Sequence, residues 1–216
     1  RDNLDIAPQT LVGAGAIGVE FSTIWNAYGT KVSLVEMLPN MLPLEDEEVS
    51  KELAKALKKK GVDVFTSHKV ETIETNANGV SVKISSNGEE KSIDAEQVLV
   101  AIGFRPNSSG IGLVDIGVSL NEHKFINIDD RQATNVPGIW AIGDVTGKLL
   151  LAHVASTQGI LCADAIANKE THPINYKMVP RATFCQPQVA SFGMTDTEAK
   201  EAGYEIKVGK FSFQAN

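Results

Sequence analysis

The sequence has few of the residues and runs that mark several large classes of protein. It holds two cysteines, Cys162 and Cys185, with no C-x-x-C spacing and no histidine at ligand spacing beside either. We interpret both as buried small hydrophobic residues, and they give no evidence for a disulfide framework, a zinc site or a redox pair. No apolar run approaches the roughly 20 residues needed to span a bilayer, and the first ten residues hold no signal-peptide core. We therefore expect a soluble protein without a membrane partner, in the cytoplasm or, in a eukaryote, an organelle matrix.

Positively charged residues are fewer than negatively charged ones. The chain has 20 Lys and Arg against 27 Asp and Glu, a net charge of -7. Nucleic-acid binding is driven by clustered Lys and Arg, so we expect no nucleic-acid partner. The 43% hydrophobic and 22% charged residues are ordinary globular values, which exclude disordered and collagen-like chains. A chain of 216 residues has room for one large domain or two small ones.

The most informative local pattern runs from residue 9 to residue 36. It predicts a short strand over Thr10–Val12, a glycine turn over Gly13–Gly18, and a helix that stops at Gly29. A second strand follows over Lys31–Val35 and ends in Glu36. This order of strand, glycine turn, helix, strand and acid is typical of a dinucleotide-binding unit.

Each part of that unit has a physical task. Gly13 permits the tight turn, Gly15 lets the backbone approach a pyrophosphate, and Gly18 lets the helix pack closely, while the helix N-terminus attracts the phosphates. Glu36, 18 residues after Gly18, would accept hydrogen bonds from the adenosine ribose hydroxyls and repel a 2′-phosphate, which favours NAD over NADP. Glycine turns also occur for packing alone, and Glu20 is explained equally well by the helix dipole and by a functional role.

The next segment predicts a helix followed by strands. The acids at the start and lysines at the end of residues 44–61 match a helix dipole, and Asn-Gly pairs join short β-type runs into an antiparallel meander. An apolar strand over Val98–Ile102 then ends at Gly103, at the sheet edge that carries the glycine turn. Gly103 would approach the nicotinamide half of the cofactor, or it simply continues a turn. The expected meander strands are residues 62–65, 70–74, 80–84 and 91–93.

Residues 108–178 offer a second candidate site. We predict strands over 125–128 and 139–142, then Gly143-Asp144, then a helix that starts near His153. Asp144 would accept a hydrogen bond from a polyol, and the helix dipole would stabilise negative charge on a ring system. His153 is read either as a capping or structural residue or as part of this site.

The blocks "LVGAGAIGVEF", "VAIGFRPN", "TNVPGIWAIGDV", "LLLAHVASTQG" and "RATFCQPQVASFGMT" resemble the dihydrolipoamide dehydrogenase family of flavoprotein pyridine nucleotide-disulfide reductases. The resemblance implies oxidation of dihydrolipoamide to lipoamide, with FAD as cofactor and NAD+ as electron acceptor. It also implies a homodimer that serves lipoyl proteins of a 2-oxo acid dehydrogenase or glycine cleavage complex. The alternatives are an NADH oxidase or mercuric reductase type of flavoenzyme, or a non-enzymatic nucleotide-binding module.

The resemblance also implies site residues. Glu20 would lie near the nicotinamide and the flavin as a support, no other catalytic residue is expected in this chain, and no metal is expected. Ser156 departs from the family, since many relatives have an acid there. The implied NAD-binding residues are Gly13, Ala14, Gly15, Ala16, Ile17, Gly18, Val19, Glu20, Glu36, Val70 and Gly103, and the implied FAD-binding residues are Asp144, Leu150, Leu151, Ala152 and His153.

We therefore expect an α/β fold in three parts. Residues 1–107 would form a Rossmann-like NAD domain with a parallel sheet and an antiparallel β-meander crossover, and 108–178 a central domain with the second part of an FAD site. Residues 179–216 would start an α+β dimerisation domain, with a half-buried strand over 206–213. The resemblance implies an internal fragment that lacks the redox disulfide and the His/Glu acid-base pair, is itself inactive, and leaves Asp144 facing water.

Overall fold

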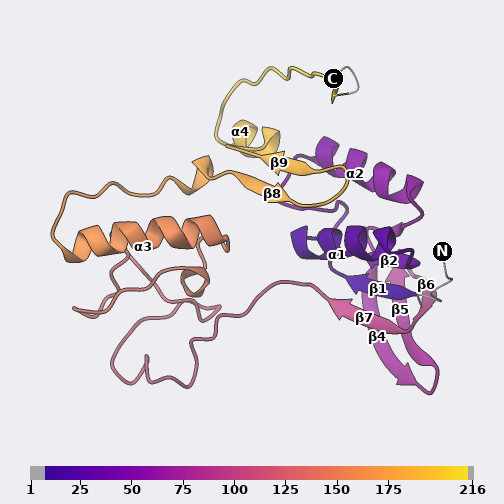
Figure 1. Cartoon of the computed structure of the whole chain (residues 1–216), viewed down its shortest axis with the longest axis horizontal. Coiled ribbons are helices and arrows are strands. Elements are labelled where there is room, and N and C mark those ends of the chain that lie inside the picture. The colour runs from indigo at the N-terminus through magenta and orange to yellow at the C-terminus, as the bar shows by residue number, and fades with distance from the viewer. Residues whose placement is uncertain (1–7, 214–216) are drawn as a thin grey trace. The chain divides into compact units, whose positions relative to one another are not determined.

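The computed structural model describes residues 8–213 (Figure 1). They divide into two compact units. One holds the residues up to Gly103 together with those from Pro180 on, and the other is Phe104–Val179. The division into domains at 107/108 and 178/179 stays a prediction. Within the described residues, no helix is long and apolar enough to cross a membrane.

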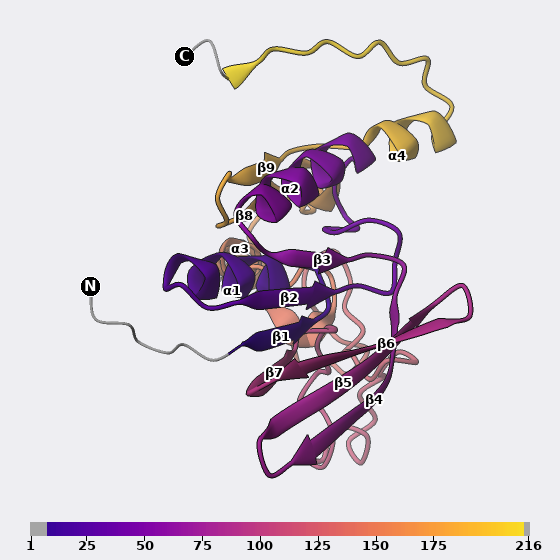
Figure 2. The ribbon, with the colours of Figure 1, turned by 90° about the vertical axis from the view of Figure 1, so that its right-hand side faces the viewer.

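The first unit is built on the predicted parallel sheet. Its strand order is β3-β2-β1-β7, and all three pairings are parallel (Figure 2). Val12 lies opposite both Val35 and Val100, so the carboxyl ends of β1, β2 and β7 meet at one edge. The bounds are β1 Gln9–Val12, α1 Ala16–Ala27, β2 Val32–Val35, α2 Glu47–Lys59, β3 Asp63–Phe65 and β7 Gln97–Val100.

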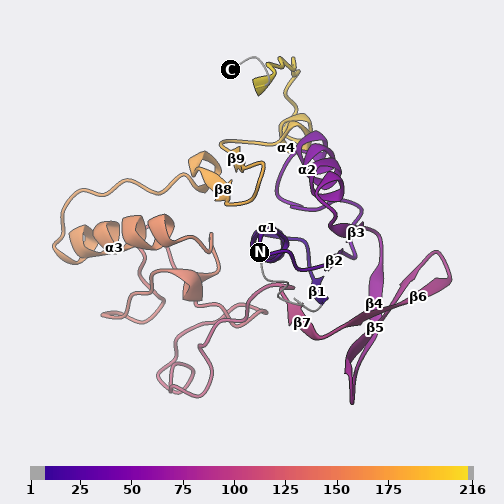
Figure 3. The ribbon, with the colours of Figure 1, turned by 45° about the vertical axis from the view of Figure 1, so that its right-hand side comes forward.

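Alternating side chains of the sheet enter two different cores. Leu34 is fully buried in a cluster with residues of both α1 and α2, among them Val19 and Leu53. The next residue, Val35, is buried against Val82 of the antiparallel sheet. Because successive strand residues point to opposite faces, helices cover one face and the antiparallel strands the other (Figure 3).

The expected antiparallel meander is confirmed for three of its four strands; the first, predicted over 62–65, is wrong, because it is β3, which pairs parallel with β2 in the first sheet. The three meander strands are β4 (Lys69–Asn76), β5 (Gly79–Ser86) and β6 (Glu89–Ala95), paired antiparallel in the order β4-β5-β6. The second connection has left-handed backbone at Asn87 (φ 51°) and Gly88 (φ 85°), which is the conformation that an Asn-Gly hairpin turn requires.

The segment from Pro180 packs on this unit through a short hairpin and a helix. The hairpin pairs β8 (Arg181–Thr183) with β9 (Val189–Ser191), and α4 is Asp196–Glu201. The Thr195 hydroxyl accepts the Glu198 N–H at 3.2 Å, and the Glu198 carboxylate accepts the Thr195 N–H at 2.8 Å. This is the capping box that fixes a helix start.

The second unit contains one long helix, α3 (Ala152–Ile166), and the short 3-10 helices η1 (Asp144–Thr146) and η2 (Tyr176–Met178). The strands predicted over 125–128 and 139–142 are wrong: these segments make only isolated bridges, Leu120 to Ile126 and Ala133 to Trp140. They are apolar enough for strands, but the described residues give them no neighbouring strand for a ladder.

Two further strand predictions need correction. The strand over 206–213 is wrong, because residues 204–212 have no regular structure and are almost entirely exposed. An alternating apolar pattern needs a partner strand to become a ladder, and no described residue supplies one. The strand predicted over 98–102 is β7, which ends at Val100 instead of Ile102.

Candidate functional site

The glycine turn after β1 is shaped by two close backbone contacts. Gly13 has φ +100°, and a Cβ there would overlap the Ala101 carbonyl at the end of β7. A Cβ on Gly18 would overlap the Gly13 carbonyl, so only glycine lets α1 pack this closely on the turn. Gly15 differs, since a Cβ there would meet no atom within 4 Å. Packing therefore explains Gly13 and Gly18 but not Gly15.

The N-terminus of α1 faces out of this turn without a side-chain cap. Gly15 is the N-cap and makes no side-chain cap hydrogen bond, and the first turn carries no acid. The helix therefore presents its positive dipole end and the backbone N–H groups of Ala16, Ile17 and Gly18, which together suit an anion.

Glu20 lies beyond the first turn of α1, which begins at Ala16. The reading of Glu20 as a dipole-compensating acid of the first turn is therefore wrong. Its carboxylate instead accepts the backbone N–H of Phe184 at 2.9 Å. Glu20 thus joins α1 to the segment just after β8.

The Glu36 carboxylate is fixed against the glycine turn. Its Oε2 accepts the Ala14 N–H at 2.7 Å, and its Oε1 accepts the Leu38 N–H at 2.8 Å. The Glu36 backbone is held as well, since its N–H donates to Phe65 and its carbonyl accepts the N–H of His68. The acid predicted for a ribose and the turn predicted for a pyrophosphate are therefore neighbours.

Of the other residues expected near NAD, Gly103 lies just beyond the same sheet edge, whereas Val19 and Val70 do not. Ala101 donates its N–H to the Val12 carbonyl at 2.7 Å, and Gly103, with φ +118°, follows two residues later. Val19 is buried in the core beneath α1, so its side chain serves packing. Val70, on β4, packs with the Val35 cluster at the end of β2.

The second candidate site lies in Phe104–Val179. Asp144 opens η1 and is exposed, as expected for a residue facing water. Leu150 and Leu151 are half-buried, while Ala152 and His153 are exposed at the start of α3. Leu151 is the N-cap, so the interpretation of His153 as a capping residue is wrong. Ser156 is satisfied locally, donating to the Ala152 carbonyl at 3.1 Å.

Sequence reasoning missed Gln158, which holds the turn before Asp144. Gln158 is fully buried; its Oε1 accepts the Gly143 N–H at 2.6 Å and its Nε2 donates to the Tyr176 hydroxyl at 3.0 Å. The signal was present, because Gln158 shares helical spacing with the buried Val154, Leu161 and Ala165. A glutamine on an apolar helix face predicts a specific hydrogen-bond partner.

The two cysteines are free and buried, as predicted. Burial raises the pKa of both the Cys162 and the Cys185 thiol, so both stay protonated near neutral pH. Among residues 8–213, no group of three or more His, Cys, Asp or Glu side chains is placed to hold a metal ion.

Comparison with known proteins identifies the family. A sequence model of the pyridine nucleotide-disulphide oxidoreductases matches residues 3–159, and the dimerisation domain of that family matches residues 179–216. The chain belongs to the pyridine nucleotide-disulphide oxidoreductase family. Among its family relatives, dihydrolipoyl dehydrogenase from Mycobacterium leprae is 52% identical over 207 residues, which cover 95% of this chain and 44% of the relative. The same-named protein of Corynebacterium glutamicum is 48% identical, over 98% of this chain and 46% of the relative.

Solved structures of the family agree with the fold. LpdA from Mycobacterium tuberculosis superposes with a TM-score of 0.83 at 28% identity, over 91% of this chain and 42% of LpdA. RclA from Escherichia coli, an HOCl-induced flavoprotein disulfide reductase, superposes with a TM-score of 0.83 at 29% identity, over 95% of this chain and 47% of RclA. The chain thus spans about half the length of the relatives it matches.

Proposed function

We propose that the edge formed by β1, β2 and β7 binds NAD. The observation that carries this proposal is the Glu36 carboxylate hydrogen-bonded to Ala14 of the glycine turn. An ionised carboxylate only accepts hydrogen bonds, so it suits the two hydroxyls of an adenosine ribose and repels a 2′-phosphate. The open side of Gly15 and the uncapped start of α1 suit the pyrophosphate.

Three residues outside the glycine turn complete the proposed site. Gly103 and Glu20 would lie on the nicotinamide side and Val70 on the adenosine side. Bound NAD+ supplies the hydride-accepting chemistry. The chain itself orients the two halves of the molecule, through backbone N–H groups at the turn and the fixed carboxylate of Glu36.

For FAD we propose Asp144 as the group that accepts a ribityl hydroxyl, with residues 150–153 beside the ring. The exposed carboxylate at the start of η1 and the α3 N-terminus, which has no side-chain hydrogen bond from its N-cap, suit a polyol and an electron-rich ring. Gln158 would fix the direction of Asp144, because it holds the Gly143 N–H. FAD, when bound, carries the electrons between disulfide and nicotinamide.

We propose for the whole protein the activity named for its relatives, oxidation of dihydrolipoamide with NAD+ as acceptor. Identities of 48–52% to dihydrolipoyl dehydrogenases support this more strongly than the 29% identity to RclA supports a flavoprotein reductase of another thiol or disulfide. The match to a dimerisation domain supports a homodimer. Lipoyl proteins of a 2-oxo acid dehydrogenase or glycine cleavage complex are the proposed partners, in the cytoplasm or an organelle matrix.

Titration calorimetry with NAD and NADP tests the proposed site. We expect NAD to bind more tightly, and Glu36→Gln to reduce the preference about tenfold, a free-energy change of about 1.4 kcal/mol. Glu74→Gln removes the same charge from an exposed position on β4 and serves as the control. A preference for NADP, or binding of neither nucleotide, would overturn the proposal.

A further inference from the structure

The loop of residues 37–46, between β2 and α2, supports the proposed NAD site from outside the glycine motif. Its Leu38 N–H donates to the Glu36 carboxylate at 2.8 Å. Its Leu42 N–H donates to the carbonyl of Ala14 at 2.8 Å. The path of this loop therefore fixes both the ribose acid and the turn, although none of its side chains belongs to the site.

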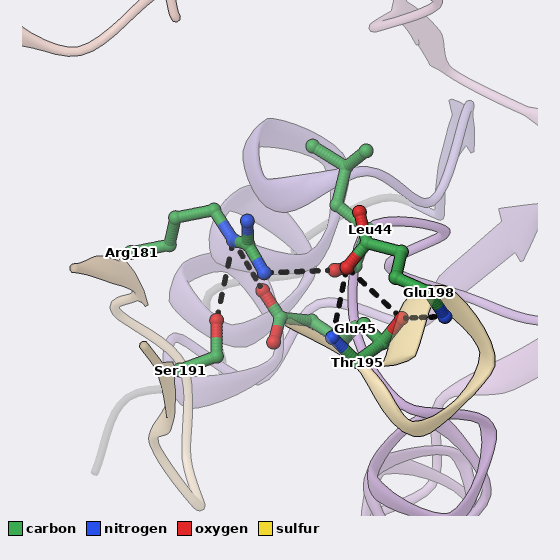
Figure 4. A network of polar contacts seen from close by, with 6 residues as sticks. All are labelled: Leu44, Glu45, Arg181, Ser191, Thr195 and Glu198. Carbon is green, nitrogen blue, oxygen red and sulfur yellow. Dashed lines mark hydrogen bonds and ion pairs between the residues drawn. The ribbon is translucent and has the colours of Figure 1, made fainter. Parts of the chain in front are cut away.

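The far end of this loop is held by the segment that matches the dimerisation domain. Arg181 of β8 donates through Nη2 to the Leu44 carbonyl at 3.1 Å, and its Nε lies 3.4 Å from Glu45 Oε1 (Figure 4). The same Nε also donates to the Ser191 hydroxyl at 3.2 Å. The Asp196 N–H donates to the Asp46 carboxylate at 2.8 Å.

The ion pair between Arg181 and Glu45 differs from the others in its burial. The Arg181 and Glu45 side chains are 17% and 9% exposed. In every other ion pair of the described residues, at least one side chain is more than half exposed. Exposed pairs add little, but removing one partner of a buried pair leaves an uncompensated charge. Glu45 without Arg181 would have to turn toward water.

The loop has room for such a movement. A cavity of about 460 Å³ lies between the loop and the dimerisation segment, lined by residues of both, among them Leu38, Leu44, Arg181 and Thr195. A shift of Glu45 would also displace Leu38 and Leu42, because they belong to the same short loop. The contacts to Glu36 and Ala14 would then lose their geometry.

We propose that Arg181 is a positioning residue for NAD: by anchoring Leu44 and Glu45 it couples docking of the dimerisation segment to the adenosine side of the dinucleotide site. The inference rests on the proposed NAD function. Coupling between sites is reciprocal, so NAD also strengthens docking of the segment. This arrangement implies that the dinucleotide site is complete only when the dimerisation segment is packed against the loop.

The test compares NAD affinity among variants of the full chain. Arg181→Met and Glu45→Gln should each raise the Kd for NAD about fivefold or more, the lower range of typical site-to-site coupling. Combining them should cost less than the two effects multiplied, because they remove one interaction. Lys51→Gln is the matched control: it removes one positive charge from an exposed pair with Glu47 on α2 and should leave the Kd unchanged.

Amide hydrogen exchange separates positioning from general destabilisation. Without NAD, Arg181→Met should speed exchange at Leu38 and Leu42 and leave Leu11 of β1 unchanged. Added NAD should slow exchange in β8 and β9 of the wild type. If Arg181→Met folds poorly, Glu45→Gln keeps the side-chain shape and carries the same test.

The outcomes are distinct. If the wild type binds NAD and both variants bind it equally well, with unchanged exchange at Leu42, the coupling is wrong and the NAD proposal stands. If the wild type binds no NAD but exchange at Leu42 still rises in Arg181→Met, the loop is positioned by Arg181 and the proposed function fails.

Discussion

Two apolar runs that are each followed by a glycine, residues 98–102 and 139–142, form different structures in this molecule. Residues 97–100 form β7 and pair along their whole length with β1. Residues 139–142 are just as apolar, yet among them only Trp140 makes a bridge, to Ala133. The difference lies in the surroundings, since β7 has a neighbouring strand within its own compact unit. An apolar run alone is therefore not sufficient for a strand, which also needs a partner backbone that stays extended over several residues.

The largest expected effect comes from breaking the turn that organises the first region. Gly18→Val would drive a side chain into the Gly13 carbonyl, and we expect a loss of about 3 kcal/mol or more in the free energy of unfolding. Denaturant unfolding followed at Trp25, which packs against the same core, measures it. Trp140 in the other unit should report little change.

Gly15→Ala is the matched control for that substitution, because a Cβ at Gly15 meets nothing within 4 Å. Its unfolding free energy should change by less than about 1 kcal/mol, while its affinity for NAD should fall. Equal destabilisation by the two substitutions would contradict the separation between packing and binding glycines.

An intermediate loss of stability is expected in the second unit, where the buried side chain of Gln158 bonds two separate segments. Gln158→Leu should destabilise Phe104–Val179 by about 1–3 kcal/mol, because it leaves the Gly143 N–H and the Tyr176 hydroxyl without this partner. Trp140 fluorescence during denaturant unfolding would show it. Tyr176→Phe removes only one of these bonds and should cost less; a larger loss in Tyr176→Phe would argue against Gln158 as the organiser.

The smallest effect concerns the buried thiol of Cys185, which is 4% exposed. Burial raises its pKa above the usual 9.0, and the charge of Glu20 acts in the same direction. The folded state therefore holds the thiol proton more tightly than the unfolded state does. This contribution is fully present below pH 9 and is lost as the pH rises through the folded pKa.

Unfolding free energies measured between about pH 8 and about pH 10 should therefore decline less steeply in Cys185→Ala than in the wild type. Cys162, whose pKa burial also raises, gives the corresponding variant in the other unit. An unchanged slope in Cys185→Ala would show that the thiol is not the titrating group.

The local sequence pattern predicted most of the first unit, because the strand, turn and helix signals there all indicate the same fold. The Asn87-Gly88 turn and the capping box at Thr195 follow from short-range chemistry. The fixing of Glu36 by Leu38 could not be predicted, because the donor is a backbone N–H with no side-chain signature. The contact between Glu20 and Phe184 joins residues 164 apart in sequence.

The sequence by itself determined the order of elements, the turn chemistry and the acid that follows β2, because each depends on propensities and spacings within about 30 residues. Tertiary structure decided which apolar runs found a partner strand, what Gln158 holds, and that Arg181 closes on Glu45 from far along the chain. Those outcomes depend on which backbones lie side by side after folding, and no local pattern encodes that.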